Sequence, residues 1–145
     1  MDVDVAVEAV IPLPREVVAS YAGDPSHAPE WYANIKSVQW WTQPPVAVGS
    51  QLDFEARFLG RRLAYTYEVV ELVAGERVVM RTADGPFPME TIYTWQSVPG
   101  GTLMRLHNRG TPSGFAKVAG PVMRKAMQRA MTKDLARLTE RLQRG

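Results

Sequence analysis

Side chains capable of metal or histidine-based chemistry are few in this sequence. The two histidines, His27 and His107, lie far apart in the chain and do not form an HxxxH or HExxH spacing, which would place two imidazoles on one helix face. Cysteine is absent, which excludes thiolate metal sites, cysteine nucleophiles and disulfides. We therefore predict no metal site, no cofactor and no histidine-based catalytic centre.

The carboxylates also give no catalytic candidate. Glu68 and Glu90 fall on the polar faces of alternating segments, and a one-residue bulge would be needed to turn either side chain inward. Thr91 and Asn108 have the apolar parity and are neutral, so they can orient a carbonyl or hydroxyl group without supplying a base. Three tyrosines could donate hydrogen bonds in the same way or serve as ordinary core: Tyr65, Tyr67 and Tyr93.

A methionine stripe marks the C-terminal segment. Met123, Met127 and Met131 recur every four positions with small alanines between them, which predicts one apolar face of an amphipathic helix. Pro121 predicts a kink, or a restart with this proline in the first turn. Because methionine is flexible and adaptable, the face could be solid core or a cavity wall. The whole stripe comprises Phe115, Val118, Ala119, Val122, Met123, Ala126, Met127, Ala130, Met131, Leu135, Leu138 and Leu142.

Alternating segments must form the structure opposite this helix. Residues 3–11 predict a strand that ends at Pro12, and residues 51–58 and 62–69 predict a hairpin with its turn at Gly60. Further strands are predicted around Trp40, through 87–96 and after the PGG turn at 99–101. The inward parity collects Phe54, Phe58, Tyr65, Tyr67, Met89, Thr91, Tyr93, Trp95, Met104 and Asn108.

Two short helices are predicted between the first strand and the hairpin. Pro14 can open the first helix as its first helical residue. Asp24 followed by Pro25 repeats the start signal for a second helix that ends near Tyr32. No linker, repeat or low-complexity tract divides the chain, so we expect one domain over residues 1–145.

Composition limits the classes of partner and compartment. The segment from Ser113 onward has eight Lys and Arg against two Asp and Glu, but no aromatic residues lie between these cations for base stacking. We therefore expect a solvated helix face rather than a nucleic-acid site. No signal peptide and no stretch of 18 apolar residues is present, so we expect a cytoplasmic protein without integral membrane association, as a monomer or homodimer.

Several local features match a known family. They are IPLPREVV after the first strand, DPSHAPEW with Trp31, the VG pair at 48–49, YTYEVVEL, GGT at 100–102 and the final amphipathic helix. On these features the chain resembles the START-like helix-grip proteins of the SRPBCC superfamily, in their polyketide cyclase/dehydrase-like branch, over essentially its whole length. The resemblance implies an α+β fold in which a curved antiparallel sheet of six or seven strands wraps around a long C-terminal helix and encloses an apolar cavity.

The expected function is binding of a small hydrophobic or aromatic molecule, such as a lipid, polyketide or other secondary metabolite, in that cavity. One alternative is an enzyme similar to polyketide cyclases and aromatases, which would act by confinement and hydrogen-bond donation. A second is an interaction scaffold with a solid core. The absence of an inward acid or base favours binding over catalysis. The predicted ligand-binding residues are the ten inward strand residues given above, together with Phe115, Met123, Met127 and Met131.

Overall fold

A computed structural model describes residues 3–111 and 120–144. Within them the chain forms one seven-stranded antiparallel sheet in the order β1-β7-β6-β5-β4-β3-β2. The strands are β1 (Val3–Ile11), β2 (Ile35–Trp40), β3 (Gln51–Phe58), β4 (Arg61–Val73), β5 (Arg77–Asp84), β6 (Met89–Val98) and β7 (Gly101–Gly110). The helices are α1 (Arg15–Ala22), the single 3₁₀ turn η1 (Pro25–His27), α2 (Ala28–Trp31) and the long α3 (Gly120–Gln143).

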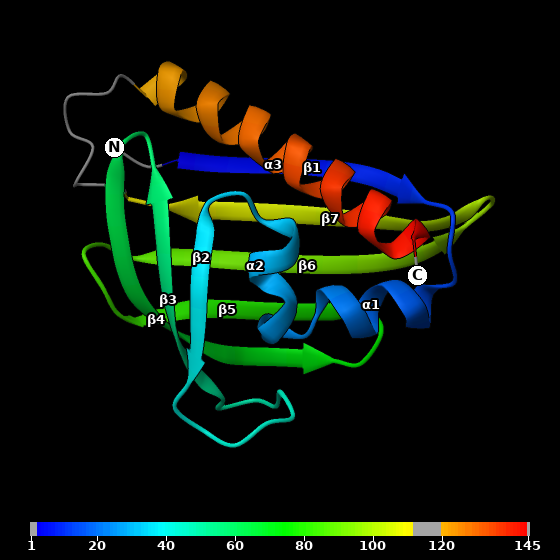
Figure 1. The fold of residues 1–145 in the computed structure, drawn as a ribbon, viewed down its shortest axis with the longest axis horizontal. Helices are drawn as coiled ribbons and strands as arrows, with labels where there is room; N and C mark the ends of the chain where they lie inside the picture. Colours follow the sequence, from blue (N-terminus) through cyan, green and yellow to red (C-terminus); the bar gives the residue numbers. More distant parts are fainter. Residues whose placement is uncertain (1–2, 112–119, 145) are drawn as a thin grey trace.

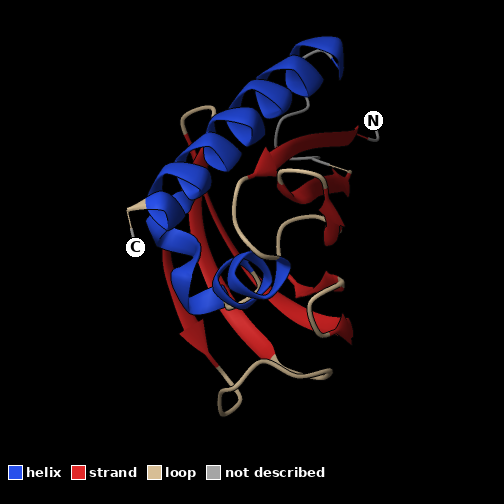
Figure 2. Ribbon diagram, turned by 90° about the vertical axis from the view of Figure 1, so that its right-hand side faces the viewer, coloured by secondary structure: helices blue, strands red, loops and turns tan. Residues whose placement is uncertain are grey.

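The sheet is strongly curved. The ladder shifts register between Ile35 and Ser37 in β2, and again between Val69 and Glu71 where β4 pairs with β5. Such bulges bend a strand and increase its twist. The predicted hairpin is confirmed, because Leu59 and Gly60, both at positive φ, form the two-residue turn between β3 and β4. Figure 2 shows the strands curving around the helices.

The helices share one face of the sheet. In Figure 1, α3 crosses the sheet diagonally near β1 and β7, while α1 contacts β6 and β7 and α2 contacts β2. Among the described residues, α3 makes its main sheet contacts with β1 and also contacts α2. The predicted helix-grip architecture is therefore confirmed, with a long C-terminal helix held against a curved sheet.

Two local predictions need correction. Pro14 is the residue before the first turn of α1 rather than its first helical residue, with φ −60° and ψ 150°. Val122 does not belong to the buried stripe of α3, because its side chain is 59% exposed. The choice between a kink and a restart at Pro121 depends on residues 112–119, which lie outside the described residues. Asp24 caps the second helical segment as expected, because its carboxylate accepts from the Ser26 N–H at 2.9 Å.

Candidate functional site

The face of α3 is divided between core and cavity. Toward its C-terminal end, Leu135 and Leu138 are fully buried and belong to the same hydrophobic core as Trp31. Toward its N-terminal end, Met123, Met127 and Met131 line a cavity of about 170 Å³ between the helix and the sheet. This volume exceeds the roughly 10 to 15 Å³ that one water needs, so a gap remains between helix and sheet at this end of α3.

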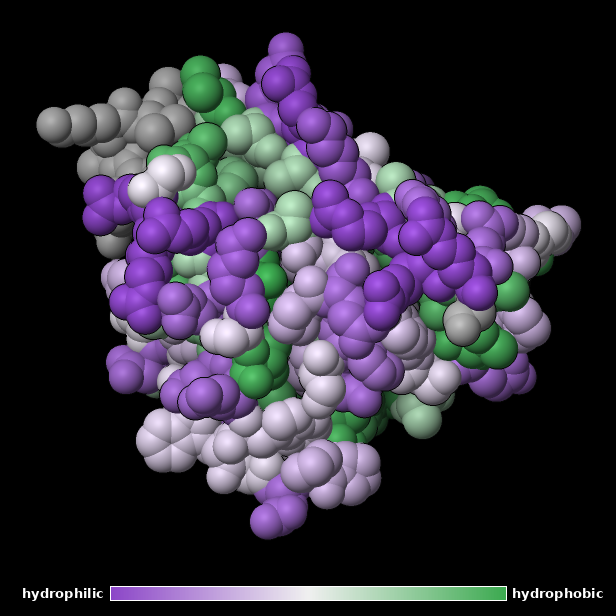
Figure 3. Space-filling model, viewed as in Figure 1, coloured by the Kyte–Doolittle hydropathy of each residue, from purple (hydrophilic) through white to green (hydrophobic). Residues whose placement is uncertain are grey.

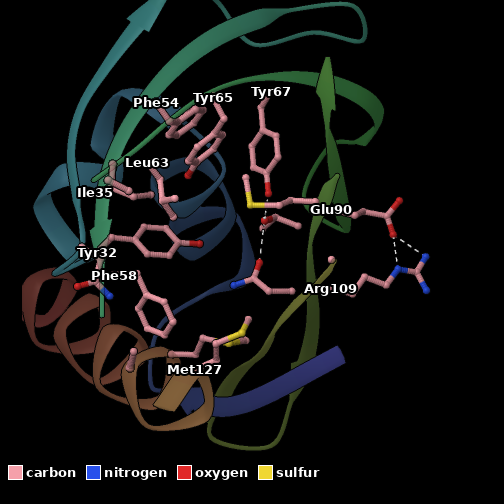
Figure 4. A pocket seen from close by; sticks show the side chains of 18 of the residues that line it. Tyr32, Ile35, Phe54, Phe58, Leu63, Tyr65, Tyr67, Glu90, Arg109 and Met127 are labelled. Carbon is pink, nitrogen blue, oxygen red and sulfur yellow. Dashed lines mark hydrogen bonds and ion pairs between the residues drawn. The ribbon is translucent and has the colours of Figure 1, made fainter. Parts of the chain in front are cut away.

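Eleven of the fourteen predicted site residues line this cavity. The rings of Phe54 and Tyr65 stack with centroids 5.5 Å apart, and Tyr67 meets both edge-on. Figure 4 shows these rings on one side of the cavity, with Phe58 and Met127 below them. The eleven residues are Phe54, Phe58, Tyr65, Tyr67, Met89, Thr91, Tyr93, Asn108, Met123, Met127 and Met131.

Three predicted residues are not placed at the cavity by the structure. Met104 is completely buried in the core, and Trp95 lies close to Gly23 just after α1. Both have the predicted inward parity, but α1 contacts β6 and β7 and occupies this part of the sheet. The alternation of side chains therefore predicted the correct face of the sheet for Trp95 and Met104. It could not predict that α1 covers this face at their positions along the strands. Phe115 lies outside the described residues.

Hydroxyl groups form two hydrogen-bonded sets in the cavity wall. Thr91 Oγ1 donates to Asn108 Oδ1 at 2.7 Å, so the Tyr67 hydroxyl, 2.8 Å away, must donate to Thr91. The hydroxyls of Tyr32 and Tyr93 are 2.6 Å apart, and only one of them can donate to the other. Burial raises the pKa values of all these tyrosines, so they remain protonated donors.

Several polar atoms in the wall keep unused hydrogen-bonding capacity. Among residues 3–111 and 120–144, the amide nitrogen of Asn108 and the hydroxyl of Tyr65 have no hydrogen-bond partner. One proton of the Tyr32–Tyr93 pair is also uncommitted. These groups could orient a carbonyl or hydroxyl of a bound molecule.

Asp134 is a buried acidic residue of the cavity wall that was not predicted from the sequence. Its side chain is 4% exposed and lines the cavity from α3. Burial raises the pKa of this carboxyl to about 6, although the Ala33 N–H, 3.1 Å from Oδ1, and the Arg137 guanidinium, 3.6 Å away, favour the ionised form. The prediction that the cavity has no inward acid or base is therefore wrong. Helical spacing could have predicted that Asp134 lies on the same face as the apolar stripe, since it is three residues after Met131 and four before Leu138.

The other acidic group at the cavity points outward. Figure 4 shows Glu90 and Arg109 directed away from the aromatic rings, as the strand parity predicted. Glu90 accepts hydrogen bonds from Arg81 and from Arg109. Burial alone would raise the pKa of Glu90, but the two guanidinium groups outweigh it and hold the pKa below its usual value. Glu90 and Arg109 thus form a compensated pair at the cavity margin.

The histidines lie away from the cavity. His27 stacks on Tyr21 with ring centroids 4.2 Å apart, and His107 contacts Asp4 across β1 and β7 at 2.5 Å. Within the described residues, no group of three or more His, Asp or Glu side chains could hold a metal ion.

None of the helices described combines the length and apolar character needed to cross a bilayer. Tyr32, Asn34, Ile35, Leu63, Met80 and Phe87 also line the cavity and were not predicted to do so.

Known proteins of the same fold support this architecture. The crystal structure of TTHA0849 from Thermus thermophilus matches with a TM-score of 0.81 at 21% identity, covering 96% of each chain. The Zhui aromatase/cyclase from Streptomyces sp. R1128 matches with a TM-score of 0.78 at 12% identity, covering 99% of this chain and 95% of the other. A START superfamily protein from Mycobacterium smegmatis matches with a TM-score of 0.77 at 19% identity, covering 99% and 97%.

Comparison of the sequence itself gives the family. No curated protein matches the chain significantly. The family model described as polyketide cyclase / dehydrase and lipid transport matches residues 2–143, which is nearly the whole sequence. The predicted resemblance is thereby confirmed. The chain belongs to the polyketide cyclase / dehydrase and lipid transport family.

Proposed function

We propose that the protein binds a small, mainly apolar molecule in the cavity between the sheet and the methionine face of α3. The observation that carries this proposal is a space of about 170 Å³ bounded by aromatic rings and thioethers, with a few uncommitted polar atoms in its wall. Apolar area supplies affinity in such sites, while a small number of polar groups fixes orientation.

The size of the cavity limits the size of the ligand that it can hold. An engineered cavity of about 150 Å³ lined by aliphatic and aromatic side chains stays dry and binds benzene. A ligand of one or two rings therefore fits this protein without rearrangement, whereas a long lipid or an extended polyketide requires the walls to move. Met123, Met127 and Met131 are suited to such movement, because methionine has three flexible side-chain bonds.

Binding of an environment-sensitive apolar dye tests the proposal. We expect dye fluorescence to rise on addition of the protein and to fall on competition with naphthalene. Substituting Met127→Trp fills the cavity and should weaken dye binding by at least about tenfold, which corresponds to about 1.4 kcal/mol. Val122→Trp is the matched control, since it adds the same ring to the same helix at an exposed position.

The outcomes separate the alternatives. If the dye does not bind, or if it binds equally well to the Met127→Trp and wild-type proteins, ligand binding in this cavity is wrong. In a filled core, Met127→Trp would instead cost about 1 to 3 kcal/mol of unfolding free energy through overpacking. Urea unfolding of both variants distinguishes a blocked cavity from a damaged core.

A second candidate is a cyclase/dehydrase-type enzyme, and Asp134 is the observation that favours it. A carboxylate among tyrosine hydroxyls could remove a proton beside one ketone while a hydroxyl donates to the other. The model reaction is closure of 2,6-heptanedione, in which the enolate carbon attacks the second carbonyl and one water is lost to give 3-methylcyclohex-2-enone. We expect a rate above the buffer background that Asp134→Asn abolishes; a rate unchanged by this substitution would exclude the role.

A further inference from the structure

We propose that Asp134 makes the cavity selective for apolar molecules with a protonated amine or another hydrogen-bond-donating group, and makes it reject amphiphiles that carry a carboxylate. This inference rests on the proposed function, since it names the class of molecule that the same cavity accepts. It is carried by the placement of charge around the cavity.

One oxygen of the Asp134 carboxyl is already engaged. Oδ1 accepts from the Ala33 N–H at 3.1 Å and lies 3.6 Å from Arg137 Nη1. Among the described residues, Oδ2 has no hydrogen-bond partner, although the side chain is only 4% exposed. A carboxylate oxygen in the wall of an apolar cavity is poorly satisfied without a donor, and a donor group on a ligand would supply one.

Arg137 does not neutralise this oxygen from inside the cavity. Its side chain is 43% exposed, and its Nη1 donates to the Trp31 carbonyl oxygen at 3.1 Å. Water therefore screens its charge, and its hydrogen bonding is directed toward the end of α2. The ion pair with Arg137 therefore compensates the charge of the ionised carboxylate only in part, and Asp134 keeps negative charge beside the apolar space.

Among residues 3–111 and 120–144, no Lys or Arg is placed to bind a ligand carboxylate in the cavity. Among the described residues, Arg109 is the only Lys or Arg that lines the cavity, and it points away from the rings and is paired with Glu90. The titratable groups around Asp134 are Arg137 on α3, Tyr32 after α2 and Tyr93 on β6. The buried side chains of β1, which also contacts α3, are aliphatic. A fatty-acid head group would therefore meet a like charge that Arg137 compensates only in part.

Three ligands that differ only in their polar group test the selectivity: 2-naphthylmethylamine, 2-naphthylmethanol and 2-naphthoate. Isothermal titration at about pH 8, where Asp134 is ionised, should rank the amine first and the carboxylate last, with about tenfold or more between these two. At about pH 5, protonation of Asp134 should reduce that ratio several-fold, although the amine and the naphthoate keep their own charges.

Asp134→Asn should reduce the amine-to-carboxylate ratio by about tenfold and change binding of the alcohol by less than about threefold. Glu140→Gln is the matched control, because it removes an acid from the exposed side of the same helix and should leave the ratio unchanged. Binding of the alcohol shows that each variant keeps a folded cavity, and the wild-type pH series does not depend on any variant.

The two proposals fail in different ways. If none of the three naphthalenes binds and none displaces the apolar dye, the proposed function itself is wrong. If they bind but naphthoate equals the amine in the wild-type protein, or if Asp134→Asn leaves their ratio unchanged, the selectivity assigned to Asp134 is wrong while ligand binding stands.

Discussion

Asp134 combines a buried position with a charge that is poorly compensated there. Its pKa of about 6 exceeds the ordinary 3.8 chiefly because burial disfavours the ionised form. The folded protein thus holds a proton that the unfolded chain releases between about pH 4 and pH 6. The contribution of this residue to stability must therefore fall as pH rises through that window.

We predict that Asp134→Asn increases the free energy of unfolding by about 2 to 3 kcal/mol at neutral pH, since two pKa units correspond to nearly that amount. Below about pH 4 the difference should disappear, because both side chains are then neutral. Urea unfolding of the two proteins across this range provides the measurement. Parallel stability curves for variant and wild type would contradict the assignment, and all other titrating groups cancel in the comparison.

The site residues also show which features of the cavity can be predicted from sequence periodicity and which cannot. Strand parity placed Tyr65, Tyr67 and Thr91 on the cavity side, because successive side chains alternate strictly between the two faces. Parity carries no information on which part of a face another element covers, and so Trp95 and Met104 were assigned to the cavity instead of the core. Asp134 was missed because the helix stripe was drawn from apolar residues alone, so an acidic side chain on the same side of the helix was not considered.

At the level of elements, the turns could be predicted from the sequence more fully than the roles of helix α3. The hairpin between β3 and β4 and the PGG turn between β6 and β7 were both found from glycine placement. The two roles of α3 were not separable, because leucine and methionine have the same apolar periodicity. Only the folded structure shows that Met123 and Met131, which belong to the same core as Leu135 and Leu138, also border the cavity.

The turn between β6 and β7 provides a prediction at this scale. A Cβ atom on Gly101 would lie 2.1 Å from the Ile11 carbonyl oxygen, whereas one on Gly100 would meet nothing within 4 Å. Both glycines have positive φ, +144° and +92°. Gly100→Ala should cost about 1 kcal/mol of unfolding free energy through backbone strain alone, and Gly101→Ala on the order of 3 kcal/mol or more because β1 must also shift. Equal losses of stability for the two variants in thermal or urea unfolding would contradict this prediction. They would show that the end of β1 moves away from residue 101 at little cost.

For the molecule as a whole, charge is divided between the helix and the rest of the chain. The Lys and Arg side chains of α3 are all exposed, and Figure 3 shows hydrophilic side chains along its outer side. Arg141 contacts Glu30 at 2.7 Å, and Arg124 donates to the Asp4 carbonyl oxygen at 3.3 Å. Exposed contacts of this kind contribute little to stability.

We therefore expect Arg124→Glu combined with Arg129→Glu, which changes the formal net charge from +2 to −2, to leave dye affinity within about twofold of wild type. The reason is that neither residue lines the cavity. Fluorescence titration at low and high salt is the measurement. A large loss of dye binding would place the ligand on the basic face of α3, contrary to the cavity proposal.

The first strand of the sheet pairs with the last one. β1 is aligned along its whole length with β7, from Ile11 opposite Thr102 to Val3 opposite Gly110, and α3 then closes over this pair. β1 is synthesised first among the strands but cannot pair with β7 until the last strand has also been synthesised, so an alternating apolar segment waits without this partner. Closure of the sheet, and with it any capture of a guest molecule, is consequently governed by long-range contacts, which form slowly.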